Sequence, residues 1–410
     1  RIFYVLMMLV VIRIGSQLPV PGVDGSYFKT WFESQTGDAF NFLDAFTGGS
    51  FSQMSIFALS ITPYITSSII IQLLTIAIPK LEEMQRDGED GRKKLGAITR
   101  YVTIGLSLFE SIAMAIGFGN KGLIPDNSFV KMVVVVVALT AGSAFLMWVG
   151  EQINEKGVGN GISIVLLINI VSRIPSDMTK LYESFMKGKI IAKALLSGVI
   201  IAAIIVGVVI LVIILNGAER RIPVQYSKKM QGRKMMGGQS SHIPLKVNTA
   251  GVIPVIFASS IMSFPSVIAS FLGKTGGTGI GGKILAGMNS NNWFDLEHPW
   301  YSIGLVAYIV MVIFFAYFYT SITFNPLEVA DNMKKQGGFI PGIRPGKPTS
   351  DYLTNMLNYI IFIGAVGLII VAVIPFFFNG VFGAHVSFGG TSIIIVVGVV
   401  LVTLNQIESQ

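Results

Sequence analysis

Few residues of this chain have the types and spacing that enzyme chemistry requires. Its three histidines are far apart, and cysteine is absent, which removes thiolate metal ligands and a thiol nucleophile. A GxGxxG pattern at residues 277–282 has no strand pattern before it and no βαβ unit after it. The P-loop-like run 277–283 is followed by Ile284, where a Mg²⁺-binding hydroxyl is needed. The sequence therefore predicts no enzyme, no metal site and no cofactor.

Two charged residues lie near the middle of long apolar runs, Arg13 in the first and Glu110 in the third. A charge in hydrocarbon is costly, so both residues are candidates for function. A structural pairing or a water-filled interior explains them equally well. A proton or ion carrier would need more buried carboxylates than one.

The composition places the chain in a membrane. Hydrophobic residues make up 52% and charged residues 13%, and the mean hydropathy is +0.68. A soluble domain has about 25% charged residues. The net charge of +8 comes largely from loops between apolar runs. We therefore expect contact with anionic lipid or with acidic faces of cytosolic partners rather than sequence-specific binding of nucleic acid.

Ten apolar runs approach the roughly 20 residues that cross a bilayer. They are residues 2–18, 62–78, 101–118, 129–149, 162–174, 190–215, 250–272, 302–323, 352–378 and 389–406. The fifth run is the shortest. Without it, the two basic loops described next would face opposite sides of the membrane. With ten spans, both termini lie on the same side as these loops.

Two basic loops dominate that side. The loop 219–248 has one acidic residue, Glu219, and the basic residues Arg220, Arg221, Lys228, Lys229, Arg233, Lys234 and Lys246. The loop 324–352 holds the run 339–346, in which Pro-Gly pairs restrict the backbone around Arg344. The excess of basic residues predicts a cytoplasmic location for both loops and both termini. We interpret the loops as adjacent docking surfaces.

The spans divide into two halves, residues 1–174 and 175–410. A repeat with an odd number of spans must be inverted relative to its partner, and the functional path of such proteins lies between the halves. No convincing sequence repeat accompanies this division. The predicted fold class is an all-α polytopic membrane protein with two inverted five-helix halves.

The segment 46–59 interrupts this plan. Gly48 and Gly49 break the chain, and residues 51–59 are too short to cross the membrane. We expect a re-entrant half-helix, which survives at membrane depth only when it is buried in protein or lines a water-filled cavity. A core-packed interfacial helix is the alternative.

Several stretches, in the same order along the chain, resemble the SecY family, the pore subunit of the Sec protein-conducting channel. They are residues 55–59 (SIFAL), 63–65 (PYI), 68–74 (SIIIQLL), 150–153 (GEQI), 159–164 (GNGISI), 244–248 (PLKVN), 250–254 (AGVIP), 330–332 (ADN) and 341–346 (PGIRPG). The loops 119–128 and 273–300 carry no resemblance.

The resemblance implies a clamshell of two halves around an hourglass pore, closed by a plug on the outer side. The plug would comprise Phe46, Gly48, Gly49, Ser50, Phe51, Ser55, Ile56 and Phe57. Since the segment holds no charged residue, we expect it to fill the outer funnel without strong polar ties. The pair Gly48 and Gly49 would serve as a hinge.

The resemblance also implies a pore ring, formed by Ile65, Ile69, Leu166, Ile170, Ile256 and Ile395. By spacing alone, an aliphatic pair at i and i+4 shares one helix face and most often packs inside a bundle. Leu166 stands where the family more usually has isoleucine. The implied lateral gate would be lined by Thr66, Ser67, Gln72, Glu110, Ser259, Ser260 and Asn325.

The implied partners are the SecE and SecG subunits, the SecA ATPase, the ribosome, signal peptides, nascent chains and membrane lipids. The chain would translocate unfolded secretory proteins across the bacterial cytoplasmic membrane and release membrane segments into lipid. A secondary transporter of a small solute would explain ten spans equally well, but not the basic loops. A structural assembly factor without a pore is a third possibility.

Overall fold

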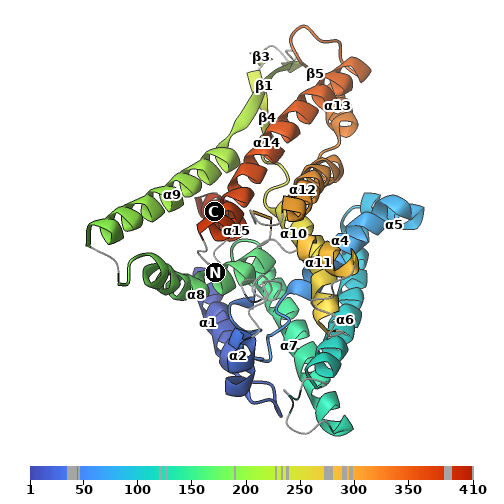
Figure 1. Ribbon diagram of the computed structural model, residues 1–410. Coiled ribbons are helices and arrows are strands. Elements are labelled where there is room, and N and C mark those ends of the chain that lie inside the picture. Colours follow the sequence, from blue (N-terminus) through green and yellow to red (C-terminus); the bar gives the residue numbers. More distant parts are fainter. Residues whose placement is uncertain are drawn as a thin grey trace.

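The computed structural model describes residues 1–34, 44, 47–119, 122, 124, 128–188, 191–226, 229–231, 234–236, 240–271, 280–288, 293–294, 299–382 and 390–408. Helices dominate the fold, and short strands gather at one end (Figure 1).

The first part of the chain is helical apart from turns. Its helices are α1 (Ile2–Gln17), α2 (Gly25–Ser34), α4 (Thr62–Ala77), α5 (Pro79–Arg86), α6 (Glu89–Gly119), α7 (Phe129–Lys156) and α8 (Gly161–Phe185). The second part contains α9 (Ile191–Gly217), α10 (Ile253–Phe271), α11 (Ile280–Met288), a 3-10 turn η2 (Pro299–Tyr301), α12 (Ser302–Thr323), α13 (Pro326–Lys335), α14 (Lys347–Phe382) and α15 (Gly390–Glu408).

Six of the described helices, namely α6, α7, α8, α9, α12 and α14, are long and apolar enough to cross a membrane. The helices α4 and α5 add a seventh span as a pair bent by 108°. Pro79 begins α5, which is polar. The axis of α5 turns away from the axis of α4. The shorter apolar helices α1, α10 and α15 complete the set. Each of the ten predicted spans therefore corresponds to one helix.

The fifth span is longer than predicted. The sequence suggested an end at Ile174, before Pro175, but α8 continues to Phe185. Proline removes one helix hydrogen bond and its ring crowds the carbonyl four residues before it, which can bend a helix without ending it. Much of the predicted loop 175–189 is therefore helix, and the boundary proposed between the halves falls inside α8.

The two predicted basic loops form one sheet. The strand β1 (Glu219–Tyr226) pairs antiparallel with β4 (Ser240–Lys246), and β5 (Gly338–Phe339) pairs with the other edge of β1. The strands β2 (Lys229–Gln231) and β3 (Lys234–Met236) form a separate hairpin. The predicted adjacency of the loops is confirmed. Alternation along β1 buries Ile222 and Val224 against Met333 and Leu353.

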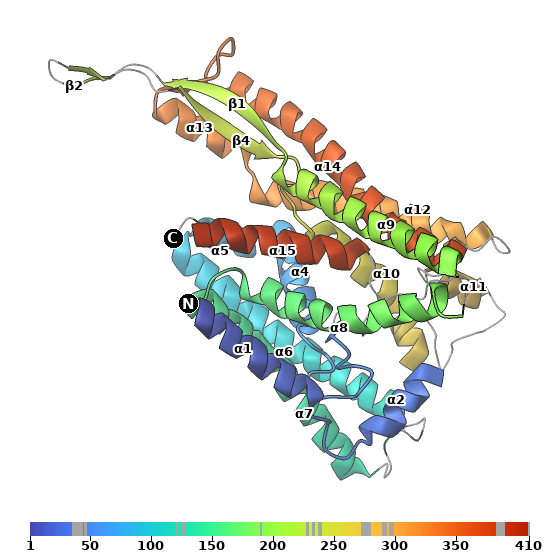
Figure 2. The same ribbon diagram turned by 90° about the vertical axis from the view of Figure 1, so that its left-hand side faces the viewer.

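The helices gather in two groups (Figure 2). The helices α1, α6, α7 and α8 lie together below α9, α12 and α14, with α10 and α15 near the boundary. Both termini, α5 and the sheet lie toward one end, whereas α2, α11 and the connection from α8 to α9 lie toward the other.

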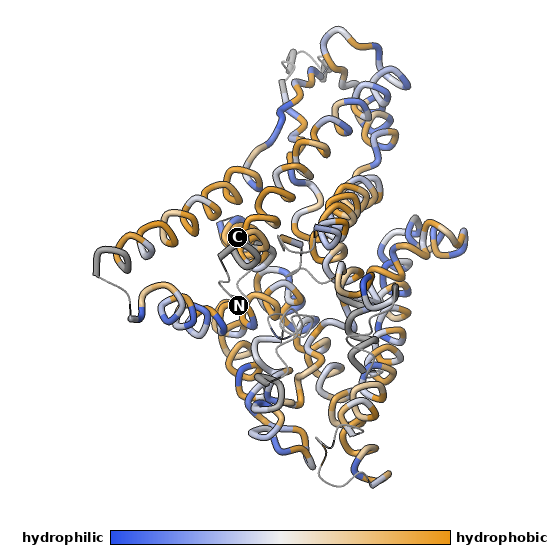
Figure 3. Tube along the Cα trace, viewed as in Figure 1, coloured by the Kyte–Doolittle hydropathy of each residue, from blue (hydrophilic) through white to orange (hydrophobic). Residues whose placement is uncertain are grey.

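The outer helices are apolar on their exposed surfaces. The tube of α9 is hydrophobic along most of its length (Figure 3). Its exposed side chains include Leu195, Val199 and Ile214. Lipid accepts such side chains without cost, so they are typical of a helix that faces the bilayer.

Candidate pore, plug and cytosolic docking face

The six predicted ring residues lie in one apolar cluster. They come from four helices: α4, α8, α10 and α15. Ile69, Leu166, Ile170, Ile256 and Ile395 are all buried, and Ile65 is partly buried against them. The structure therefore brings together side chains that are up to 330 positions apart in the sequence, from 65 to 395. Contact alone is compatible with packing as well as with a constriction.

A rigid turn between α7 and α8 positions Leu166 and Ile170. The side chain of Asn160 caps α8 by accepting hydrogen bonds from the backbone N–H groups of Ile162 and Ser163. The backbone N–H of Gly161 donates to Asn154 at 2.7 Å. A Cβ atom on Gly161 would lie 1.9 Å from the carbonyl oxygen of Gly150, so only glycine permits this approach.

The same turn is tied to α15, which carries Ile395. The backbone N–H of Gly159 donates to the side-chain oxygen of Gln406 at 2.8 Å. Gly159 has a φ of +88°, a conformation that favours glycine. This contact links two of the four helices that supply the ring residues.

The plug segment differs from the predicted half-helix. Residues 48–61 form successive turns, with Met54 and Ser60 at positive φ values of 48° and 51°. The segment pairs with the chain that follows α1, through hydrogen bonds of 3.0 Å from Val20 N–H to Met54 and from Ile56 N–H to Leu18. Strand-like pairing satisfies backbone groups that a short helix would leave open. Phe46 lies outside the described residues.

Small residues let the plug segment pack closely against α1 and α7. A Cβ atom on Gly15 would lie 2.1 Å from the ring of Phe57, and one on Gly142 would lie 2.1 Å from the carbonyl oxygen of Ile56. Phe57 also belongs to the apolar cluster of the ring residues. The plug segment therefore lies directly against the candidate constriction.

A second apolar cluster holds the other end of the plug segment. Phe51 packs with Phe28 of α2 and Phe118 of α6, and the rings of Phe28 and Phe118 are 4.9 Å apart in an edge-to-face contact. Asp24 fixes the start of α2. Hydrogen bonds from the Ser26 hydroxyl and from the backbone N–H groups of Tyr27 and Ser26 hold the pKa of Asp24 below its usual value.

The expectation that the plug lacks strong polar ties is wrong. Arg13 donates hydrogen bonds to the carbonyl of Gly48 at 3.4 Å and to Ser172 at 3.0 Å. Asp44 forms an ion pair with Arg173 and accepts a hydrogen bond of 2.8 Å from the backbone N–H of Ser52. The charged partners Arg13, Asp44 and Arg173 all lie outside residues 46–59. The composition of the segment therefore could not reveal these contacts.

Arg13 therefore has a structural pairing, one of the two explanations that its sequence position left open. The Asp44–Arg173 pair was missed by the sequence analysis. The only local indication of this pair is Arg173, a charged residue at the end of the fifth apolar run. Its partner Asp44 lies 129 positions away in the sequence, so no local pattern connects the two. Asp44 is 2% exposed and Arg173 14% exposed at their side chains, so the pair is largely shielded from water.

The predicted gate residues lie on helices that approach each other, since α6 contacts both α4 and α10. Thr66 and Ser67 direct their hydroxyls to carbonyls of their own helix, as hydroxyls in apolar helices commonly do. The side-chain oxygen of Gln72 and the hydroxyl of Ser259 are buried and have no hydrogen-bond partner in the described part of the chain.

The other three residues predicted to line the gate lie in different environments. Glu110 and Ser260 are half-buried, and Glu110 makes no ion pair with any described residue. Asn325 is exposed and caps α13 by accepting a hydrogen bond of 3.2 Å from the backbone N–H of Leu327. Its side chain is thus engaged at the start of α13, next to the sheet, rather than between the spans.

The predicted docking residues lie on and beside the sheet. Arg220 and Arg221 are exposed on β1, and Arg221 pairs with Glu219 at 2.7 Å. Lys229 and Lys234 belong to the hairpin of β2 and β3. Lys228 and Arg233 lie outside the described residues. An exposed pair such as Arg221–Glu219 contributes little stability, so the arginine is available to a partner.

Arg344 is exposed on a turn that its neighbours fix. Gly342 and Gly346 have φ values of +85° and +107°. The hydroxyl of Thr349 donates to the carbonyl of Arg344 at 2.8 Å, and the backbone N–H of Thr349 donates to Gly346. The predicted restriction of this backbone is therefore confirmed, while the role of the guanidinium stays a prediction.

These features define a class: polytopic helical membrane proteins whose helices converge on an apolar centre, with a folded segment packed against it and a structured face outside the membrane. The SecY family matches residues 55–404. The chain belongs to the SecY family.

Relatives match over the full length of the chain. A protein translocase subunit SecY from Halalkalibacterium halodurans is 44% identical, covering 100% of this chain and 94% of the relative. One from Bacillus subtilis is also 44% identical with the same coverage. One from Escherichia coli K12 is 41% identical, covering 100% of this chain and 90% of the relative.

Solved structures share the fold. A structure described as a protein-conducting channel superposes with a TM-score of 0.65 at 19% identity, covering 100% of this chain and 91% of that one. A SecY structure described with its plug domain gives a TM-score of 0.67 at 18% identity and the same coverage. Sec61 in a canine ribosome-channel complex gives 0.64 at 17% identity.

Proposed function

We propose that this chain is the pore-forming subunit of a channel that conducts unfolded proteins across the bacterial cytoplasmic membrane. The observation that carries the proposal is the convergence of six aliphatic side chains from four helices on one cluster, against which Phe57 packs. Membership of the SecY family supports the same function.

An aliphatic constriction suits a chain of variable sequence. A narrow apolar ring excludes ions by dewetting. It offers no fixed hydrogen-bond partner, so polar and apolar side chains can slide past. Stiff β-branched isoleucines keep the aperture defined, and Leu166 loosens it slightly.

The plug segment closes the resting channel in this proposal. Its packing against Gly15 and Gly142 supports a defined closed position, and the polar contacts of Arg13 and Asp44 hold it there. Opening must therefore separate both apolar and polar contacts. Such a cost suits a gate that opens only when a substrate supplies binding energy.

The helices α4 and α6 on one side and α10 and α12 on the other form the lateral gate. Single hydrogen bonds between membrane helices average about 0.6 kcal/mol, so a seam with few of them parts at low cost. The buried, unpartnered oxygen atoms of Gln72 and Ser259 support this interpretation, because a polar signal segment could satisfy them.

The two halves, residues 1–174 and 175–410, would open about this seam to release membrane segments into lipid. SecE and SecG complete the complex. The SecA ATPase or a ribosome docks on the face that carries Arg220, Arg221 and Arg344, which places the sheet and both termini in the cytoplasm. Arg344 on its fixed turn suits bidentate pairing with a carboxylate or a phosphate.

A secondary transporter of a small solute is the competing function. Such a carrier needs convergent polar or charged groups at mid-depth, whereas the six converging residues here are aliphatic. A small-solute carrier also does not explain why the two basic loops form a folded sheet.

The test is reconstitution of the complete complex into vesicles with SecA, ATP and a secretory precursor, scored by protection of the precursor from protease. Protection that depends on SecA and ATP supports the proposal. Uptake of a small solute without protection of the precursor contradicts it. With Arg344→Glu, the docking proposal predicts weaker SecA binding and slower translocation, and wild-type binding and rate would contradict it.

A further inference from the structure

The plug segment buries apolar side chains in two different clusters. Phe57 packs in the cluster that contains the ring residues. Phe51 and Met54 pack in a second cluster, together with Met114 and Phe118 near the end of α6. The helix α6 also contacts α10 across the proposed lateral gate. The plug segment therefore lies against the ring on one side and against a gate helix on the other.

Three aromatic rings make the contact with α6, and we call them the aromatic triad: Phe28 of α2, Phe51 of the plug segment and Phe118 of α6. The centroid of the Phe118 ring is 4.9 Å from that of Phe28 and 6.2 Å from that of Phe51, and both contacts are edge-to-face. All three side chains are buried. Edge-to-face contacts depend on the relative position of the rings, so a movement of Phe118 weakens both of its contacts at once.

The helix α2 lies directly against the plug segment. Among residues 25–30 of α2, only Phe28 is buried. A Cβ atom on Gly25 would lie 3.0 Å from the backbone carbonyl oxygen of Gln53. The ring of Phe28 therefore bridges the plug segment and the end of α6.

The polar contacts of the plug segment lead to other helices. The carbonyl of Gly48 accepts a hydrogen bond from Arg13 of α1. The backbone N–H of Ser52 donates to Asp44, which pairs with Arg173 of α8. Apolar contacts thus join the segment to a gate helix, and polar contacts join it to α1 and to a helix that carries ring residues.

We propose that the aromatic triad couples the lateral gate to the plug. A movement of α6 away from α10 withdraws Phe118 from Phe51 and frees one side of the plug segment. A signal segment that binds the open gate better than the closed gate supplies the free energy for this movement. The polar contacts hold the segment until the gate has opened. This inference rests on the proposed function and adds an order of events, in which the gate moves first and the plug second.

The test uses the complete channel complex in vesicles, with SecA, ATP and two precursors. One precursor has an intact signal and the other a signal with a shortened apolar core. The readout is the signal ratio, defined as the protected fraction of the second precursor divided by that of the first. Phe118→Leu removes the ring and keeps an apolar side chain, so the plug needs less help from the signal. The signal ratio should rise roughly two- to tenfold, as expected for the loss of edge-to-face ring contacts.

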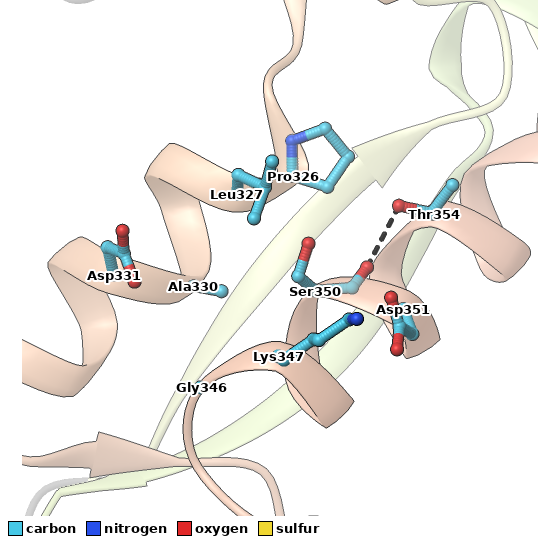
Figure 4. A pocket seen from close by; sticks show the side chains of 9 residues that line it. All are labelled: Pro326, Leu327, Ala330, Asp331, Gly346, Lys347, Ser350, Asp351 and Thr354. Atoms are coloured by element: carbon cyan, nitrogen blue, oxygen red, sulfur yellow. Dashed lines mark hydrogen bonds between the residues drawn. The ribbon is translucent and has the colours of Figure 1, made fainter.

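Two control variants separate this coupling from a general loss of stability. Phe376→Leu also removes a ring from an aromatic cluster, since Phe376 lies edge-to-face at 4.9 Å from Trp293 and at 5.7 Å from Tyr308 in the second half of the chain. Thr354→Val removes the hydroxyl that donates to the Ser350 carbonyl at 2.9 Å in α14 (Figure 4). Both variants should keep the wild-type signal ratio, even where their thermal unfolding temperature falls.

A reducible linker between Phe51→Cys and Phe118→Cys tests the release itself. The two rings are 6.2 Å apart, so a short linker can join the introduced thiols. Linking should stop transport of the precursor with the intact signal, and reduction should restore it.

Full transport through the linked pair would overturn the coupling. An unchanged signal ratio for Phe118→Leu, or an equal rise for Phe376→Leu, would also overturn it. In each of these cases, signal-dependent transport by the unmodified complex would leave the proposed function intact. If the unmodified complex does not protect the precursor with the intact signal, the proposed function and the coupling both fail.

Discussion

Asn169 of α8 donates a buried hydrogen bond of 3.0 Å to the hydroxyl of Ser60, where the plug segment runs into α4. Asn169 stands between the ring residues Leu166 and Ile170. Ser60 also accepts, through its carbonyl, a hydrogen bond of 3.2 Å from Ser143. One helix thus carries part of the proposed ring and also holds Ser60, which directly follows the proposed plug segment.

Asn169→Ala should loosen the closed state of the plug. Loss of one buried hydrogen bond costs roughly 1 kcal/mol, which corresponds to about a fivefold shift between closed and open forms. Resting ion conductance in planar bilayers measures this shift. Asn355→Ala, at an exposed position of α14, is the control. Equal conductance of Asn169→Ala and wild type would contradict a role of this contact in closure.

The Asp44–Arg173 pair should stabilise the plug only as a pair. Arg173→Gln leaves a buried, uncompensated carboxylate, which costs roughly 3–5 kcal/mol. The double variant Asp44→Asn, Arg173→Gln should recover much of this loss, since no charge is left buried. Thermal unfolding and resting conductance of the single and double variants form the cycle. Additive effects would show that the two side chains act independently.

Gly142→Ala should displace the plug segment by contact. The added methyl group would lie 2.1 Å from the carbonyl oxygen of Ile56, so either the segment or α7 must move. We expect a folded channel that conducts ions at rest. Gly105→Ala in α6 is the matched control, because no atom lies within 4 Å of its added methyl group. If neither variant leaks, the segment is a packed structural element rather than a plug.

Locking α4 to α10 should block translocation. These 410 residues contain no cysteine, so cysteine pairs introduced into them form crosslinks without competing thiols from this part of the protein. Pairs placed across these helices should crosslink in the resting state and stop SecA-driven transport, and reduction should restore it. Efficient transport through a crosslinked pair would exclude a gate at this seam.

The sequence predicted the spans well because an apolar run is a local property that lipid imposes on each helix. The sequence did not predict the conformation of the plug segment, whose backbone pairs with residues 18–20 instead of forming a helix. It also did not predict that β1 pairs with β5. These contacts join distant positions, and their energies depend on register and packing. The ring residues could be chosen only through the family resemblance, since Ile164 of α8 is equally aliphatic and equally buried.

That comparison gives the most direct test of the central claim. Ile170→Asn and Ile164→Asn place the same polar group in the same helix and the same apolar cluster, and only Ile170 belongs to the proposed ring. Resting ion conductance of the reconstituted complex is the measurement. A polar side chain wets an apolar constriction, so Ile170→Asn should conduct ions while Ile164→Asn only lowers stability. Equal conductance of the two variants, or a leak from Ile164→Asn alone, would mean that the pore does not run through these residues.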